Sequence, residues 1–119
     1  MNRYILTQYI GERYAVSPDF PWPKHPSYAV FRHSSQRKWF ALIMEVPSST
    51  LGLEGNAVDG VEIVNLKARP EWIGQLRHST GILPAYHMNK EHWISVVLRE
   101  VDDETLKQLL HESFNLTAN

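Results

Sequence analysis

Residues 84–98 read PAYHMNKEHWISVVL, a polar segment rich in ring side chains that runs directly into a hydrophobic one. The polar part, residues 84–92, contains two histidines, a lysine and an asparagine, and we call it the ring-rich turn. The hydrophobic part, residues 93–98, is β-branched and aromatic, which is typical of a buried strand. Folding alone gives little reason for the composition of the turn, so it is the first place to look for a function.

The segments that flank this stretch predict two helices and an edge strand. After it, Asp102 or Asp103 is suited to cap a helix. Apolar residues then recur at spacings of 3, 1 and 4 and predict a core-facing stripe of Leu106, Leu109, Leu110 and Phe114. Before it, Pro84 restricts residues 82–86 to the edge of a sheet, because proline has no amide hydrogen to donate. Residues 69–78 begin with a proline and an acid, as helices often do, and place three apolar side chains on one side, Trp72, Ile73 and Leu76.

The first half of the chain predicts one helix and three strands. Residues 3–14 fit a helix whose buried face would hold Tyr4, Ile5, Tyr9 and Ile10. Four prolines in residues 17–26, the proline-rich segment, exclude regular structure there, and we expect Phe20 and Trp22 to pack the segment onto the body of the protein. Strands are expected at residues 28–33, 38–46 and 61–66, with a hairpin turn at 34–37 and a loop at 48–60.

The predicted elements follow the order α-β-β-β-α-β-β-α. Short connections favour antiparallel pairing, and helices bury their apolar stripes against a face of a sheet. We therefore predict an α+β fold, a two-layer sandwich with a mainly antiparallel five-stranded sheet and helices on one face. At 119 residues the chain, residues 1–119, is expected to form a single domain.

The composition is that of a globular protein, with 43% hydrophobic and 21% charged residues, and is unlike that of a disordered chain. No run of 18 apolar residues is present to span a membrane. The first residues lack the apolar centre of a signal peptide, and the absence of cysteine excludes disulfides and thiolate metal sites. Together these features predict a cytoplasmic protein that does not use a membrane as its partner.

The net charge of −1 weighs against strong non-specific binding to nucleic acid, which usually needs a basic excess. The charges are unevenly distributed, however. Residues 24–39 contain four bases and no acid, and residues 67–99 contain five bases and two acids, whereas the tail from Glu100 onward has five acids and one lysine. This distribution fits either one basic and one acidic face or an ordinary mixed surface.

Several segments of the chain resemble the MmcQ/YjbR family, small bacterial domains described as DNA-binding-like. The most specific match is Pro84–Lys90 with His92-Trp93, which resembles the signature turn and strand of that family. Residues 66–71 resemble its strand end and helix start, and residues 111–114 resemble its closing helix, where a serine precedes an aromatic. Residues 19–22 and 38–41 are weaker markers.

The resemblance implies a fold shared with type III secretion chaperones, often called CyaY-like, in agreement with the element order above. The family is also compared with the double-wing DNA-binding domain of a phage transcription factor, which implies double-stranded DNA as a partner. The slight negative charge of this chain departs from that of a generic DNA-binding protein.

For DNA binding, phosphates would meet the basic hairpin, acting as a wing, and the ring-rich turn. The candidate contact residues are Arg32, Arg37, Lys38, Lys67, His87, Asn89, Lys90 and His92. Lys67 lies close to a helix start, where backbone amides favour an anion. For Asn89 and Lys90 a solvated turn is an equally good interpretation, because asparagine tolerates positive φ.

The ring side chains allow other interpretations. His87 and His92 are five residues apart and have no clear third ligand, so we expect their rings to hydrogen-bond the turn rather than to bind a metal. Most tryptophans in a domain of this size belong to the core, and Trp93 is the one we expect at a surface groove. A small-molecule pocket lined by Tyr86, His87, His92 and Trp93 would require a concave site there.

The sequence contains no G-x-S-x-G, no phosphate-binding glycine loop and no H-E-x-x-H motif. We therefore expect neither enzymatic activity nor a cofactor. The alternative to DNA binding is a protein-interaction module, either a homodimer or a peptide-binding domain like the secretion chaperones. Its contact surface would be the sheet edge near Pro84 together with the proline-rich segment.

Overall fold

The computed structural model describes residues 1–52 and 60–118. The elements in chain order are α1 (Arg3–Tyr14), β1 (Ala29–Arg32), β2 (Trp39–Pro47), the 3-10 helix η1 (Ser48–Leu51), β3 (Gly60–Lys67), α2 (Pro70–Leu76), β4 (Ile82–Pro84), β5 (Trp93–Val97) and α3 (Asp103–Thr117). The predicted order of helices and strands is confirmed. The expected loop at 48–60 instead begins with η1, and residues 53–59 of that loop lie outside the described residues.

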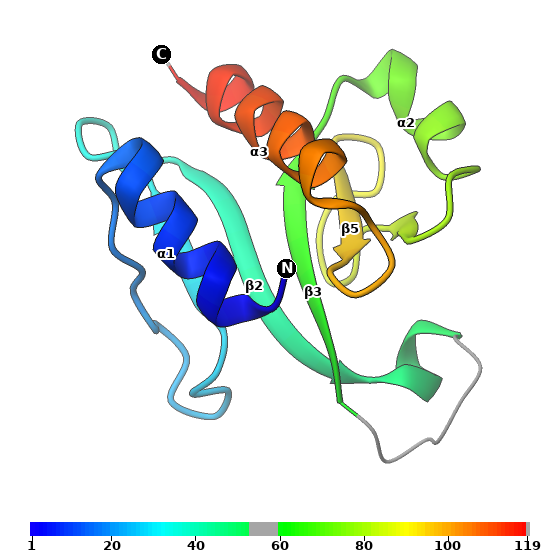
Figure 1. Cartoon of the computed structure of the whole chain (residues 1–119), viewed down its shortest axis with the longest axis horizontal. Coiled ribbons are helices and arrows are strands. Elements are labelled where there is room, and N and C mark those ends of the chain that lie inside the picture. The colour runs from blue at the N-terminus through cyan, green and yellow to red at the C-terminus, as the bar shows by residue number, and fades with distance from the viewer. Residues whose placement is uncertain (53–59, 119) are drawn as a thin grey trace.

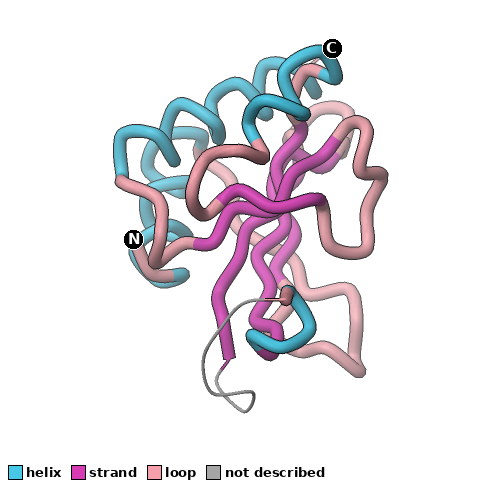
Figure 2. Tube along the Cα trace, turned by 90° about the vertical axis from the view of Figure 1, so that its right-hand side faces the viewer, coloured by secondary structure: helices cyan, strands magenta, loops and turns pink. Residues whose placement is uncertain are grey.

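The strands form one five-stranded sheet in the order β1-β2-β3-β5-β4, and every neighbouring pair is antiparallel. β4 is at an edge, as Pro84 requires. The long helices α1 and α3 cross one face of the sheet (Figure 1), and the view from the side shows helices on one side of the strands and long loops on the other (Figure 2). The predicted two-layer α+β fold is therefore confirmed. None of the helices in the described part of the chain is long and apolar enough to cross a membrane.

The helices bury their apolar residues in a core on this face. α3 begins at the predicted cap, where the Asp102 side chain accepts a hydrogen bond from the Thr105 amide at 3.1 Å. Its residues Leu106 and Leu110 are fully buried, which confirms the predicted stripe. In α2 Ile73 is buried, as predicted, but the Trp72 side chain is half exposed.

The predicted buried face of α1 is wrong for its first half. Leu6 and Ile10, one helical turn apart, are the fully buried residues, whereas Tyr4 and Ile5 are 78% and 52% exposed. A buried face that contains Ile5 and one that contains Leu6 both fit the helical period. Which of the two is buried depends on how the helix is rotated against the sheet. Two large apolar side chains are therefore left on the surface.

A β-bulge at the start of β2 sets the direction of Trp39. Phe31 pairs with Ala41, but the next residue, Arg32, pairs with Trp39, so that Phe40 is an extra residue in β2. Phe40 and Ala41 both pack in the core beneath the helices. Without the bulge, Trp39 would face the same way as Ala41; with it, Trp39 joins the residues on the opposite face.

That opposite face, which we call the open face, is apolar and is covered by loops. Its buried residues form a second cluster of Val30, Leu42, Met44, Val46, Val61, Ile63 and Val97. Trp22 of the proline-rich segment and Tyr86 and Met88 of the ring-rich turn pack against it. The expectation for Trp22 is confirmed, but Phe20 is 54% exposed and does not pack inward. Two irregular segments, together with Leu51 of η1, thus shape the described surface over this face.

Candidate functional site

The ring-rich turn is anchored to the open face by two buried polar side chains. Asn65 in β3 and Ser95 in β5 are directly paired and completely buried, and the Ser95 hydroxyl donates to Asn65 Oδ1 at 2.5 Å. Asn65 Nδ2 donates to the carbonyl of Tyr86, and the Tyr86 amide donates to the Ser95 hydroxyl, both at 2.8 Å. Both backbone polar groups of Tyr86 are therefore held by the sheet.

The next residue, His87, has a φ of 57°, in the left-handed region that non-glycine residues seldom adopt. Such a conformation persists only where its surroundings hold it, and here the clamped backbone of Tyr86 precedes it. Farther along, Asn89 closes the turn: its Oδ1 accepts from the Glu91 amide at 2.8 Å, and its carbonyl accepts from the amides of His92 and Trp93. Within the described residues, the hydrogen bonds that shape the turn come from these groups and not from the two histidine rings.

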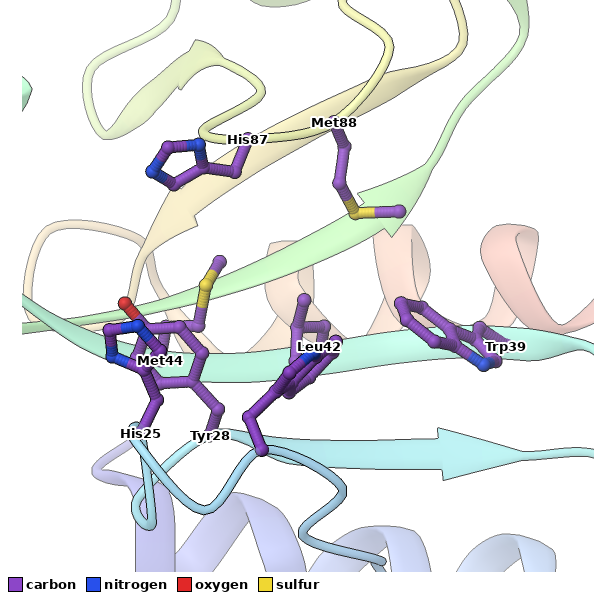
Figure 3. Close-up of a pocket in the computed structure, with 8 residues that line it drawn as sticks. His25, Tyr28, Trp39, Leu42, Met44, His87 and Met88 are labelled. Carbon is purple, nitrogen blue, oxygen red and sulfur yellow. The ribbon is translucent and has the colours of Figure 1, made fainter.

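A hollow of about 420 Å³ opens between the turn, β2 and the proline-rich segment. It is lined by Trp22, His25, Tyr28, Trp39, Leu42, Met44, His87 and Met88. Figure 3 shows His87 and Met88 on one side of the space and Tyr28, Leu42 and Met44 on the other. We call this hollow the aromatic pocket, and its volume lies within the range of ordinary ligand sites.

The rings of the aromatic pocket hold one another in position. The Trp22 ring meets the Trp39 ring edge-on, with centroids 5.5 Å apart and an interplanar angle of 85°, and meets Tyr28 at 6.1 Å and 77°. The His25 ring stacks on Tyr28 at 4.5 Å and 12°. Burial raises the pKa of the Tyr28 hydroxyl, and the neighbouring Tyr86 raises it further. The tyrosine therefore remains a neutral hydrogen-bonding group near neutral pH.

Beside the aromatic pocket, two cross-strand pairs each set a cation next to a tryptophan. Arg32 pairs with Trp39, and Lys67 pairs with Trp93. Paired residues share a face of the sheet, and both pairs lie where β1 and β3 end and β2 and β5 begin. Lys67 is two positions beyond Asn65, whose side chain reaches the turn, so it also points to the open face.

An acid outside the hairpin, Asp19, partly neutralises the positive charge of the hairpin. Asp19 of the proline-rich segment accepts a hydrogen bond from Arg32 Nε at 2.6 Å and lies 3.9 Å from the guanidinium of Arg37. The Arg32 guanidinium also lies 5.4 Å from the centre of the Trp39 ring. Residues 24–39 contain no acid, but the fold brings Asp19 to Arg32 and Arg37. The cationic end of the open face is therefore weaker than the sequence of the hairpin indicates.

Comparison with known proteins shows to which family the chain belongs. The YjbR family model matches residues 12–116, most of its length. The chain belongs to the YjbR family. It is 46% identical over 118 residues to the Bacillus subtilis protein YyaQ, which covers 98% of both chains. A crystal structure of a Pseudomonas syringae protein is 45% identical in sequence, with a TM-score of 0.95. The match covers 99% of this chain and 100% of the Pseudomonas chain. A Deinococcus radiodurans structure matches 97% of the chain and 77% of its own with 28% identity and a TM-score of 0.71.

In this YjbR-family protein, the sequence-predicted contact residues fall into two groups. Arg32, Arg37 and Lys38 on the hairpin lie at the same end of the open face as Lys67, and His87 lines the aromatic pocket. The other three residues lie elsewhere on the ring-rich turn. Asn89 shapes the turn. Lys90 lines a hollow beside α2, and its carbonyl accepts a hydrogen bond from Arg77. His92 is exposed, and its carbonyl accepts a hydrogen bond from the Ala68 amide.

The concave site that we expected beside the ring-rich turn has a different lining from the predicted one. His87 does face a hollow, but its other walls come from the proline-rich segment and β2. Tyr86 lines a separate hollow with Leu51 and Lys90. No group of three histidine or acidic side chains in the described part of the chain is placed to hold a metal ion.

Two kinds of site residue in this YjbR-family chain were not predicted from the sequence. Asn65 and Ser95 lie within predicted strands, and a polar residue within an apolar strand is a signal of a buried hydrogen bond. The pocket residues His25, Tyr28 and Met44 carried no signal of their own. The number of aromatic residues in the proline-rich segment was the nearest indication.

Proposed function

We propose that the protein binds nucleic acid through the cationic end of its open face, without catalysing a reaction on it. The observation that carries this proposal is the pair of cross-strand contacts, each with a cation beside a tryptophan: Arg32 with Trp39 and Lys67 with Trp93. Cations neutralise phosphates, and tryptophan faces stack on bases. Cations and tryptophans side by side at one end of the sheet can therefore contact phosphates and bases at the same time.

The charge distribution supports local rather than general contact with a polyanion. The chain as a whole carries a net charge of −1, so that its overall field does not attract nucleic acid. The aromatic pocket beside the cations is lined by neither carboxylates nor lysine or arginine. Asp19 lies against the hairpin, where its carboxylate is already engaged with Arg32.

The test compares two lysines that differ in position. Lys67→Gln removes a charge from the open face, whereas Lys107→Gln removes one from α3, where the lysine lies 3.7 Å from Glu104. We expect Lys67→Gln to weaken the binding of fluorescently labelled DNA severalfold and to reduce the slope of log affinity against log salt by about 1. Lys107→Gln should bind as the wild type does. Equal effects of the two substitutions, or none, would remove the open face as the contact surface.

A second candidate function, self-association, is favoured by one surface feature. Tyr4 and Ile5 on α1 are 78% and 52% exposed, and Phe20 nearby is 54% exposed. Tyr4 and Phe20 line the same groove. Large apolar groups gathered on a surface often mark a contact with another protein. The predicted alternative surface at the β4 edge is less suitable, because β4 has only three residues and ends in Pro84.

Light scattering at increasing concentration tests self-association. A dimer that becomes monomeric when Tyr4 and Ile5 are both replaced by serine would support the second candidate. A wild-type protein that stays monomeric up to millimolar concentration would exclude it.

A further inference from the structure

We propose that the aromatic pocket holds an unstacked base, so that the preferred ligand is single-stranded nucleic acid. This inference rests on the proposed function and goes beyond it, because binding to phosphates alone does not distinguish a single strand from a duplex. The pocket adjoins the cationic end of the open face through Trp39, which lines the pocket and is paired with Arg32.

The shape of the pocket suits a flat group. Figure 3 shows a gap with His87 and Met88 on one side and Tyr28 and Met44 on the other. A ring that enters this gap contacts apolar and aromatic surfaces on both sides. The edge-on contacts of Trp22 with Trp39 and Tyr28, at 5.5 and 6.1 Å, hold these rings in position before any ligand arrives. Such preorganisation lowers the entropic cost of binding.

The chemistry of the lining selects among flat ligands. The walls contain no carboxylate, and cationic residues adjoin them: Lys24 precedes His25 in the chain, and the Arg32 guanidinium lies 5.4 Å from the Trp39 ring centre. A cationic ligand would be repelled by these neighbours, whereas an anionic group attached to a flat ring would be attracted. A nucleobase with its phosphate has this combination, and imidazole nitrogens can hydrogen-bond its polar edge.

A base within a duplex cannot reach this site. Its faces are covered by neighbouring bases and its edge by its partner, so that entry would require unpairing and unstacking. A base in a single strand enters at much lower cost, and stacking on an aromatic side chain stabilises the bound base. The pocket therefore favours a single strand over a duplex of the same length.

The conformation of His87 provides a clean variant. Its φ of 57° is one that glycine adopts without strain, so His87→Gly removes the ring and leaves the backbone of the turn in a permitted conformation. The matched control is His78→Gly, which removes an exposed imidazole just beyond α2, away from the open face. Thermal unfolding of each variant confirms that it is folded before its binding is measured.

The experiment measures fluorescence anisotropy with three labelled probes of equal length: oligothymidylate, an abasic strand with the same sugar-phosphate backbone, and a duplex. We expect oligothymidylate to bind about tenfold or more tightly than the abasic strand and more tightly than the duplex. His87→Gly should reduce the preference for bases, and His78→Gly should retain it.

The possible failures are distinguishable. Equal affinity for the abasic strand and oligothymidylate would overturn the base pocket and leave phosphate binding by the open face intact. A duplex that binds as tightly as the single strand would also overturn it. A preference for bases that survives His87→Gly unchanged would show that bases bind elsewhere. Absence of binding to all three probes at low salt would remove both this inference and the proposed function.

Discussion

At the level of single residues, Asp19 controls how much positive charge the hairpin offers to a ligand. Its carboxylate accepts from Arg32 and lies within 3.9 Å of Arg37. We expect Asp19→Asn to tighten DNA binding severalfold at low salt, because the amide carries no charge to oppose phosphate. The backbone of residue 19 stays bonded to Val30 through two hydrogen bonds of 2.9 Å, so the segment should keep its place. Weaker binding in an anisotropy titration would mean instead that Asp19 is needed to position Arg32.

Asn65 tests the anchor of the ring-rich turn. Asn65→Ala leaves the part-buried Tyr86 carbonyl without its donor and the buried Ser95 hydroxyl without its acceptor. An unsatisfied buried polar group costs about 1–3 kcal/mol, so we expect urea unfolding to show a loss of this size. Asn115→Ala on the exposed side of α3 is the control and should change stability by less than about 0.5 kcal/mol. A loss in the control as large as that in Asn65→Ala would contradict a specific anchoring role.

At the level of elements, Ser113 joins α3 to two strands. Its hydroxyl donates to the Phe40 carbonyl at 2.6 Å and accepts from the Lys67 amide at 2.9 Å. Phe40 is the extra residue of the β-bulge, so the helix supports the irregularity that turns Trp39 to the open face. Ser113→Ala should cost about 1–3 kcal/mol in the free energy of unfolding, measured by urea denaturation. The exposed Ser79→Ala serves as its control, and a neutral Ser113→Ala would show that the two backbone groups find other partners.

His33 links the end of β1 to the end of α3, and it makes this contact sensitive to pH. Its Nε2 lies 2.7 Å from the Thr117 hydroxyl, and its ring packs against Phe114 at 4.3 Å between centroids. Burial lowers the pKa of His33 below its ordinary value of 6.5. Between the two pKa values the unfolded chain binds a proton that the folded chain does not, so stability is lost as pH falls below about 6.5.

The comparison with His33→Gln isolates this effect from the carboxylates, which also titrate in acid. We expect the melting temperature of the wild type to fall more than that of the variant between pH 8 and pH 5.5, because glutamine takes up no proton in this range. Parallel curves for the two proteins would show that His33 does not contribute to the pH dependence.

At the level of the whole molecule, the net charge of −1 limits the electrostatic part of binding. Lys24, Arg37, Lys38 and Lys67 lie near the proposed site together with Arg32, and the Asp19 carboxylate offsets one of these positive charges. For a single strand each phosphate contact contributes about −0.7 to the slope of log affinity against log salt. We expect a total slope no steeper than about −3 for the wild-type protein, measured by titrations at several salt concentrations. A much steeper slope would place additional phosphate contacts on another surface.

The order of the elements followed from local chemistry. Pro84 excluded a central strand, Asp102 or Asp103 marked the start of α3, and the spacing of Leu106 and Leu110 marked its buried side. These signals act within a few residues of one another, so that they can be read from the chain. The buried side of α1 could not be predicted from such local signals, because Ile5 and Leu6 both fit an amphipathic pattern. Packing against the sheet buries Leu6 and leaves Ile5 exposed.

From the sequence by itself came the class of fold, the edge position of β4 and the prediction of a site at the ring-rich turn. The tertiary structure determined the candidate site: the bulge that turns Trp39 to the open face, the Asn65–Ser95 anchor beneath the turn, and the contact of Asp19 with Arg32. Each of these depends on residues far apart in the chain, and their meeting depends on register and packing that no local pattern encodes. Helix caps and proline effects are local, whereas a binding site is an arrangement of distant residues.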